Sequence, residues 1–267
     1  MNYSFFRKTF RDFKWSIILY SLIVLLYGVL IISFFPSIQE SSVDFEKLLE
    51  SYPPVFMEAF GINFDTIGTI EGFLSMEYLS VIWVIIMGIL IFSLGASIVS
   101  KEVDKGTSEF SFTLPLKRWK IVLSKFIASF CISIIIVLIT LASVIAGAYM
   151  IEETINLKGF FAFSLIAFAL YFFLLSFATF FSSIFSDKGK VFSICGGFLV
   201  LSYVLHVFVK INESISSLYF LSFFKYYGNP EVILRNGSID VKNILVLLSV
   251  GLIFLIFGLI VSERRDL

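Results

Sequence analysis

Charged residues are scarce in this sequence of 267 residues. Asp, Glu, Lys and Arg together make up 15% of the chain and hydrophobic residues 58%, whereas soluble domains have about 25% charged and about 45 to 50% apolar residues. The mean hydropathy is +0.98. This composition excludes an ordinary soluble domain and is typical of an integral membrane protein. Lys plus Arg and Asp plus Glu number 20 each, so the net charge points to no nucleic-acid or anionic partner.

Groups that support catalysis or metal binding are also scarce. His206 is the only histidine, and the two cysteines, Cys131 and Cys195, lie far apart inside apolar runs. This excludes a disulfide framework, a paired-cysteine metal motif and a zinc site with two histidines. The Gly-Lys pair at 189–190 is followed by valine, where a phosphate loop requires Ser or Thr. We therefore expect this chain to bind neither ATP nor a metal by itself.

Six stretches are long and apolar enough to cross a membrane as helices, which takes about 17 to 25 residues. They contain no Asp, Glu, Lys or Arg, and they cover residues 17–35, 78–99, 126–151, 160–185, 191–209 and 244–261. The sequence therefore predicts an all-α, polytopic membrane protein with six transmembrane helices. Glycines within the spans are expected to allow close helix packing, among them Gly95, Gly196, Gly197, Gly251 and Gly258.

One enzymatic alternative survives this survey, an intramembrane serine protease that pairs Ser97 with His206. Ser97 lies near the end of the second predicted span and His206 near the end of the fifth. Because these spans run in opposite directions, most of the bilayer separates the two side chains, far beyond hydrogen-bond reach. An aspartyl protease would need acids within the spans, and the spans have none.

Basic residues are concentrated on one side of the predicted topology. With six spans the two termini share a side, and 14 of the 20 Lys and Arg residues fall on it: Arg7, Lys8, Arg11, Lys14, Lys101, Lys105, Lys117, Arg118, Lys120, Lys125, Lys188, Lys190, Arg264 and Arg265. Cytoplasmic segments carry such an excess. Both termini are therefore expected to be cytoplasmic.

The segment before the first span is amphipathic. Its aromatic residues recur at helical spacing at Phe6, Phe10 and Phe13. Its bases follow on a neighbouring face at Arg7, Arg11 and Lys14. The pattern predicts a helix lying at an anionic membrane surface. Two interpretations remain open and compatible, a simple positively charged anchor and an elbow that also contacts a cytoplasmic partner.

Two longer segments fall on the opposite side. Residues 36–77 carry an amphipathic pattern that predicts short helices capping the outer face. Residues 210–243 are dense in aromatic side chains, which favour the membrane interface or a half-inserted hairpin. These aromatic residues are Tyr219, Phe220, Phe223, Phe224, Tyr226 and Tyr227.

The segment between the second and third spans, residues 100–120, is longer and more mixed than a simple connection requires. Gly106 can end the incoming helix, Thr107 or Ser108 can cap a new one, and Pro115 stops it. The sequence therefore predicts a short cytoplasmic helix. Its apolar residues, which would otherwise face water, suggest docking on a partner or on the membrane surface, and they are Phe110, Phe112 and Leu114.

This segment resembles the signature of permease subunits of the ABC type-2 exporter family. In that signature an acid follows the second span, then come Gly-Thr, a second acid, a proline, a base, and a lysine at the start of the third span. The matching residues are Glu102, Gly106, Thr107, Glu109, Pro115, Arg118 and Lys125. Lys117 stands where members often have serine. With the basic N-terminus, the resemblance covers the whole chain, as a single permease domain over residues 1–267.

The resemblance implies one half of a transporter in the plasma membrane of a bacterium. Two such subunits, identical or related, would join two separate ATP-binding subunits, which hold the ATP and magnesium. The short helix would be the coupling helix, docked through Phe110, Phe112 and Leu114. Glu102, Glu109 and Arg118 would act as polar fasteners.

The spans present aromatic surfaces and no charged site, which favours an amphipathic or lipophilic cargo such as a peptide antibiotic, toxin or drug. The main alternative is a membrane sensor or scaffold with the same fold that transports nothing. Copurification of an ATPase would separate an exporter from this alternative and from the protease.

Overall fold

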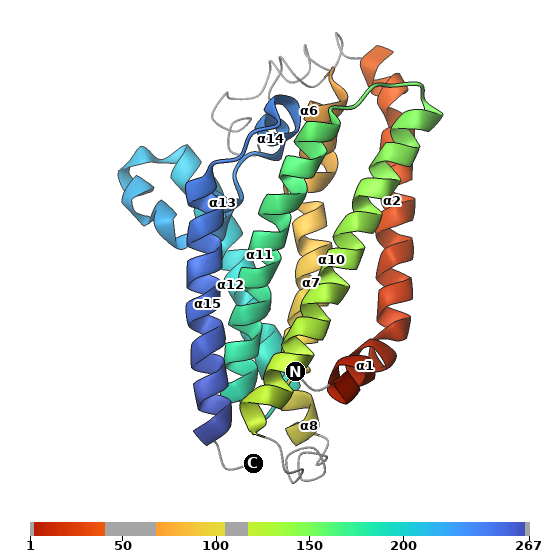
Figure 1. The fold of residues 1–267 in the computed structure, drawn as a ribbon. Coiled ribbons are helices and arrows are strands. Elements are labelled where there is room, and N and C mark those ends of the chain that lie inside the picture. The colour runs from red at the N-terminus through yellow and green to blue at the C-terminus, as the bar shows by residue number, and fades with distance from the viewer. Residues whose placement is uncertain (1–2, 41–67, 105–116, 265–267) are drawn as a thin grey trace.

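The computed structural model describes residues 3–40, 68–104 and 117–264, and every regular element within these ranges is a helix. The long helices run side by side as a bundle (Figure 1). They are α2 (Lys14–Glu40), α7 (Ile82–Ala96), α10 (Arg118–Met150), α11 (Leu157–Ile184), α12 (Lys188–Ile211) and α15 (Val241–Arg264). Among the described residues, five helices are long and apolar enough to cross a membrane, and the number is six if a bent pair that includes α7 counts as one span. The prediction of an all-α polytopic protein is confirmed.

The second span begins earlier than predicted and is bent. Helix α6 (Ile70–Leu74) leads into the π-helical turn η1 (Ser75–Leu79), and this unit meets α7 at 43°. Thr69 caps α6 by accepting a hydrogen bond from the backbone N–H of Gly72. The predicted span starts at residue 78, whereas helical structure already begins at Ile70 and includes Glu71 and Glu77. An acid in the first turn stabilises a helix N-terminus, so Glu71 does not prevent the helix.

Two other predicted boundaries differ from the structure in the same direction. Helix α2 continues through Pro36 to Glu40, past the predicted end at residue 35. A proline removes one backbone donor, and near the end of a helix this loss does not stop it. Helix α10 starts at Arg118 rather than at residue 126. Polar and basic residues thus extend the helices beyond their apolar lengths.

Helix α11 is the centre of the bundle. In its most apolar stretch of 18 residues, 78% of the residues are buried, against 22% in the corresponding stretches of α12 and α15 and 17% in that of α2. Close contacts explain this burial, because a Cβ on Gly95 of α7 would clash with the Cβ of Ala178, and one on Gly251 of α15 would lie 3.0 Å from the Cα of Phe173. The packing role predicted for these glycines is confirmed.

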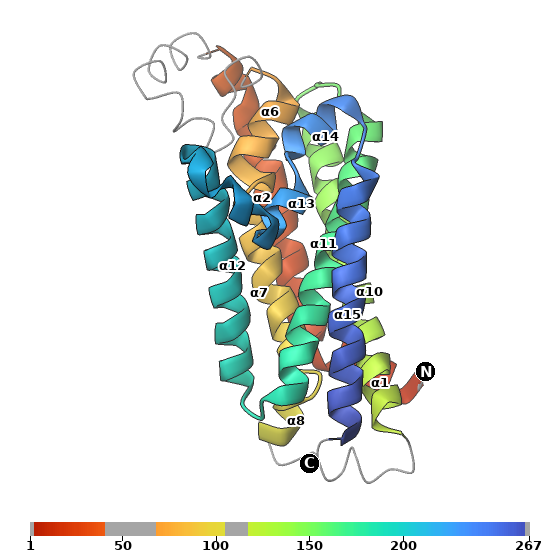
Figure 2. The same ribbon diagram turned by 90° about the vertical axis from the view of Figure 1, so that its left-hand side faces the viewer.

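The same prediction was wrong for Gly196 and Gly197 of α12. Within the described residues, a Cβ added at either position would meet nothing within 4 Å. Helix α12 packs against α7 on another side (Figure 2), where Leu199 lies against Gly88, so Gly196 and Gly197 lie on a part of its surface that the described helices leave uncovered.

Three short helices connect α12 to α15: η2 (Glu213–Leu221), α13 (Phe223–Tyr227) and α14 (Pro230–Asn236). Phe223, Phe224 and Tyr227 are buried inside the protein, so for these three the interfacial prediction was wrong, although Phe220 is exposed. The Tyr227 hydroxyl donates to the carbonyl of Leu79 at 2.8 Å. We call this end of the bundle the α14 end and the opposite end, where α1 and the end of α15 lie, the α1 end (Figure 1).

Candidate coupling site at the α1 end

Three segments that are distant in sequence meet at the α1 end. Helix α1 (Tyr3–Asp12) lies across the lower end of α2 and against the first turns of α10 (Figure 1), and Lys8 connects it to α8 (Ser100–Asp104). The inward face of α1 carries Phe5, Thr9 and Phe13, which recur every four residues and are buried. The predicted amphipathic helix is thus present, with Phe5 rather than Phe6 and Phe10 as its most buried aromatic residue.

The bases predicted for this N-terminal elbow face outward. Arg7, Arg11 and Lys14 are all exposed. Lys8, which lies between the inward and outward faces, reaches Glu102 instead. Helix α1 therefore has an exposed basic face available for the membrane surface or a partner, and an inner face that is part of the protein.

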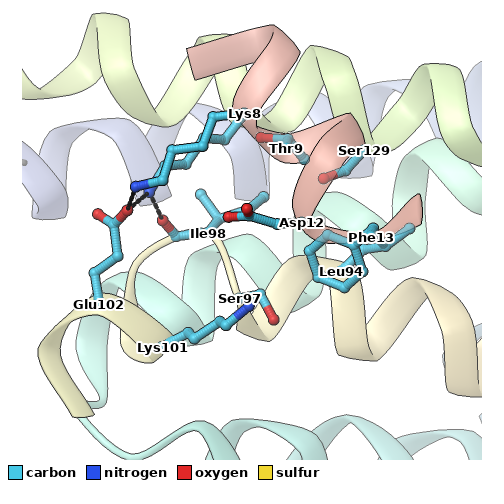
Figure 3. Close-up of a pocket in the computed structure, with 11 residues that line it drawn as sticks. Lys8, Thr9, Asp12, Phe13, Leu94, Ser97, Ile98, Lys101, Glu102 and Ser129 are labelled. Carbon is cyan, nitrogen blue, oxygen red and sulfur yellow. Dashed lines mark hydrogen bonds and ion pairs between the residues drawn. The ribbon is translucent and has the colours of Figure 1, made fainter. Parts of the chain in front are cut away.

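An ion-pair cluster joins the three segments, as Figure 3 shows. The ammonium group of Lys125, from α10, lies 2.7 Å from Oε1 of Glu102, from α8, and donates to the carbonyl of Ile98 at 3.0 Å. The ammonium group of Lys8, from α1, lies 3.4 Å from the same Glu102 oxygen. One carboxylate oxygen is thus shared by two cations on different helices.

The two halves of the closest pair are buried. The Lys125 side chain is 7% exposed and the Glu102 side chain 10%, whereas that of Lys8 is 42% exposed. The ring of Phe5 lies 5.9 Å from the Lys125 ammonium group and shields it from one side. A buried pair of this kind needs its full set of partners, because removing one charge leaves the other desolvated.

Ser182 of α11 fastens the start of α8 to the core. Its hydroxyl oxygen accepts hydrogen bonds from the backbone N–H groups of Val99 at 3.1 Å and Ser100 at 3.0 Å. The Ser100 hydroxyl in turn donates to the carbonyl of Phe185 at 2.7 Å. The turn between α7 and α8 is therefore fastened to the C-terminal end of α11, the most buried helix.

The start of α10 is held by the last helix of the chain. The Glu263 carboxylate of α15 accepts a hydrogen bond from the backbone N–H of Trp119 at 3.0 Å. A carboxylate at a helix N-terminus satisfies a free donor and complements the helix dipole. Arg118, one of the predicted fasteners, is the first residue of α10 and is half-buried.

The structure brings together some of the predicted site residues. Glu102 and Lys125 form the buried pair. The predicted coupling helix lies outside the described residues, together with Gly106, Thr107, Glu109, Phe110, Phe112, Leu114 and Pro115. The sequence reasoning missed Lys8, which it counted only as positive charge, and Ser182, which it counted as part of an apolar span. The sequence offered one signal that Lys8 belongs to the site, its position one residue before Thr9, which faces inward. It offered no such signal for Ser182.

Ser97 and His206, the residues of the protease alternative, each contact a different partner. The Ser97 hydroxyl donates to the Ser93 carbonyl of its own chain segment at 2.6 Å, and Nδ1 of His206 lies 3.0 Å from the Tyr219 hydroxyl. Ser97 lines a cavity with α1 residues, and His206 lines another with residues of η2, α13 and α14. In the described part of the chain, no group of three His, Cys, Asp or Glu residues could hold a metal ion.

This fold and site define a multi-pass helical membrane protein whose second span ends in a charged junction with the N-terminal helix. The family model described as ABC-2 family transporter protein matches residues 6–267, nearly the whole chain. The chain belongs to this family, as a membrane-spanning permease component of a transporter. The predicted resemblance is confirmed. A comparison with curated proteins gave no match.

Proposed function

We propose that this permease is driven by a separate ATPase and that the segment between α8 and α10 transmits the ATPase movement to the spans. The observation that supports the proposal is the buried pair of Glu102 and Lys125 at 2.7 Å. Glu102 lies just before the segment, and Lys125 lies on the helix that follows it. A force applied to the segment therefore reaches α10 through a direct contact as well as through the chain.

The contacts of α8 with other elements extend this transmission. Ser182 ties the beginning of α8 to α11, the central helix, and Lys8 ties Glu102 to α1. A movement of α8 must then break these contacts or carry α1, α10 and α11 with it. Switching between two arrangements requires such a discrete contact network. Phe110, Phe112 and Leu114 remain the proposed docking residues, with Glu109 and Arg118 beside them.

The remaining parts of the proposal follow from the family and the charge distribution. Two permease subunits, identical or related, assemble with two ATP-binding subunits, which hold the ATP and magnesium. The chain lies in the plasma membrane of a bacterium with both termini in the cytoplasm, and the complex exports an amphipathic or lipophilic compound. The long apolar helices and the absence of acids and bases from the predicted spans support such a cargo.

The test is reconstitution of the chain with its ATPase in proteoliposomes. Glu102→Gln and Lys125→Gln should each leave a complex that assembles but exports poorly, with ATP hydrolysis that no longer responds to cargo. The double exchange Glu102→Lys with Lys125→Glu should recover part of the export. Lys158→Gln, an exposed lysine at the other end of the bundle, serves as the matched control. Export at the parental rate by both single variants would contradict the coupling role, and absence of any associating ATPase would favour the sensor or scaffold.

Orientation has its own test. In a chain with Cys131 and Cys195 replaced, a single cysteine at Ser238, which is exposed after α14, should react with an impermeant thiol reagent in intact cells. A single cysteine at Ser186, which is exposed between α11 and α12, should react only after permeabilisation. The reverse result would place both termini outside.

A further inference from the structure

The ion-pair cluster forms one wall of a cavity of about 300 Å³ at the α1 end. The cavity lies between α1, the α7–α8 junction and α10 (Figure 3). Its volume is at the lower end of the range of small-molecule sites, about 300 to 1,000 Å³. Phe13 and Leu94 lie on the side away from Glu102, whereas Ile98 lies beside the ion pairs, where its carbonyl accepts from Lys125. The lining is therefore divided into a charged half and an apolar half.

The charged half favours an anion. Lys8, Lys101 and Lys125 line the cavity with two carboxylates, Asp12 and Glu102, which leaves an excess of one positive charge (3 − 2). Lys101 forms no ion pair within the described residues, and its ammonium group lies 5.2 Å from the centre of the Phe13 ring. The ammonium group of Lys101 can therefore donate hydrogen bonds to a ligand in the cavity.

A buried hydroxyl group also faces the cavity. Ser129 is 1% exposed, and its hydroxyl has no hydrogen-bond partner among the described residues. The other two hydroxyls that line the cavity do have partners, since Thr9 donates to the Phe5 carbonyl and Ser97 to the Ser93 carbonyl. Figure 3 shows Ser129 pointing toward the space between Thr9 and Asp12. An unpaired buried polar group is costly, so a ligand that bonds to Ser129 would be stabilised.

We propose that this cavity binds the phosphate group of an anionic membrane lipid, held by Lys101 and Ser129. The apolar side chains of Phe13 and Leu94 accommodate the glycerol and the first carbons of the acyl chains, which a free phosphate would leave uncovered. The exposed bases Arg7 and Arg11 lie on α1, the helix that forms one wall of the cavity, and such bases attract anionic lipids to a membrane surface. This inference concerns the isolated chain and does not rest on the proposed coupling to an ATPase.

The experiment compares two lipids that differ only in the phosphate group. The purified full chain in detergent is incubated with phosphatidic acid or with diacylglycerol of the same acyl chains, and binding is measured by native mass spectrometry. Phosphatidic acid should bind about tenfold more tightly, the ratio expected for one charge-assisted hydrogen bond. Equal binding of the two lipids would overturn the proposal.

Substitutions at the two proposed phosphate-binding residues test where the lipid binds. Lys101→Gln and Ser129→Ala should each weaken phosphatidic acid binding about three- to tenfold, and Lys101→Arg should retain it. Lys190→Gln, an exposed lysine in the first turn of α12 at the same end, is the matched control and should change nothing. Thermal unfolding without lipid verifies that each variant folds. An equal loss in Lys190→Gln would show a general surface effect and contradict the site.

Inorganic phosphate distinguishes a lipid from a free anion. Millimolar phosphate should stabilise the parent chain less than phosphatidic acid does. If phosphate raises the melting temperature of the parent but not of Ser129→Ala, while phosphatidic acid has no effect, then the ligand is free phosphate and the lipid assignment is wrong.

Discussion

Both ends of the bundle have hydroxyl groups bonded to the backbone, but the α1 end has ion pairs between helices as well. At the α1 end, Glu102 is shared between Lys8 and Lys125, which come from different helices. At the α14 end the contacts are neutral and directional. There Ser202 accepts from the backbone N–H of Phe223 at 3.0 Å, and Ser75 accepts from that of Glu231 at 3.1 Å.

This difference determines how each end of the bundle responds when the helices move. A charge pair tolerates changes of distance and angle, and an acid with two cations can lengthen its contact with one while it stays paired with the other. A hydroxyl bonded to a backbone group is weaker and loses its energy when the geometry changes. The α14 end is thus built as a fixed cap, and the α1 end as a junction that can rearrange while it stays connected.

The strongest way to break the α1 end is to remove its most buried charge. Lys125→Met takes from Glu102 the cation at 2.7 Å and should lower the free energy of unfolding by about 3 to 5 kcal/mol. Denaturant unfolding in detergent micelles measures this loss. The double variant Glu102→Leu with Lys125→Met should recover most of it, because no buried charge then remains without its partner. A double variant as unstable as the single one would show that packing, not charge, holds the junction.

The next largest effect is expected when the contact between the start of α8 and the central helix α11 is broken. Ser182→Ala removes the acceptor of two buried backbone N–H groups, those of Val99 and Ser100, and should cost about 1 to 3 kcal/mol. Ser176→Ala is the matched control, since the Ser176 hydroxyl is also buried in α11 but donates only to the Phe172 carbonyl of its own helix. Hydrogen exchange at Val99 and Ser100 should accelerate in the first variant and not in the second. Equal stability losses in both would mean that Ser182 acts only as an ordinary helix residue.

The α14 end should respond less to a single deletion. Tyr227→Phe keeps the buried ring and removes the bond from the hydroxyl to the Leu79 carbonyl. We expect a loss of about 0.5 to 1.5 kcal/mol, unchanged by salt because no charge is involved. Tyr149→Phe, at a residue that is 85% exposed, should have no effect. A salt-dependent loss in Tyr227→Phe would contradict the neutral character of this end.

The sequence predicted the spans better than the contacts between them. Apolar length was enough to place α10, α11, α12 and α15 in the membrane, because hydrocarbon leaves the backbone no alternative to helix. The bend before α7 was missed, since it falls at the break between Leu79 and Ile82, where Val81 leaves helical geometry and no residue pattern indicates a bend. At the site, the family pattern identified Glu102 and Lys125 as separate positions. Their direct pairing, and the contact of Lys8 with the same carboxylate, depend on how α1, α8 and α10 pack together, which is a tertiary arrangement and not a property of spacing.

The smallest expected effect tests whether the second cation on Glu102 is a structural or an exchangeable partner. Lys8 is 42% exposed and lies 3.4 Å from the carboxylate, so solvent screens the interaction, and Lys8→Gln should cost only about 0.2 to 1 kcal/mol at low salt. The loss should vanish near 1 M salt, where the screening length is about 3 Å, whereas the loss in Lys125→Met should persist because that pair is buried. Arg11→Gln, which removes an exposed base of the same helix, is the control for net charge. In the Lys125→Met background, Lys8 becomes the nearest described cation to Glu102, and Lys8→Gln should then cost more than it does alone. Strict additivity of the two substitutions would show that Lys8 does not replace Lys125, and the α1 end would then be as fixed as the α14 end.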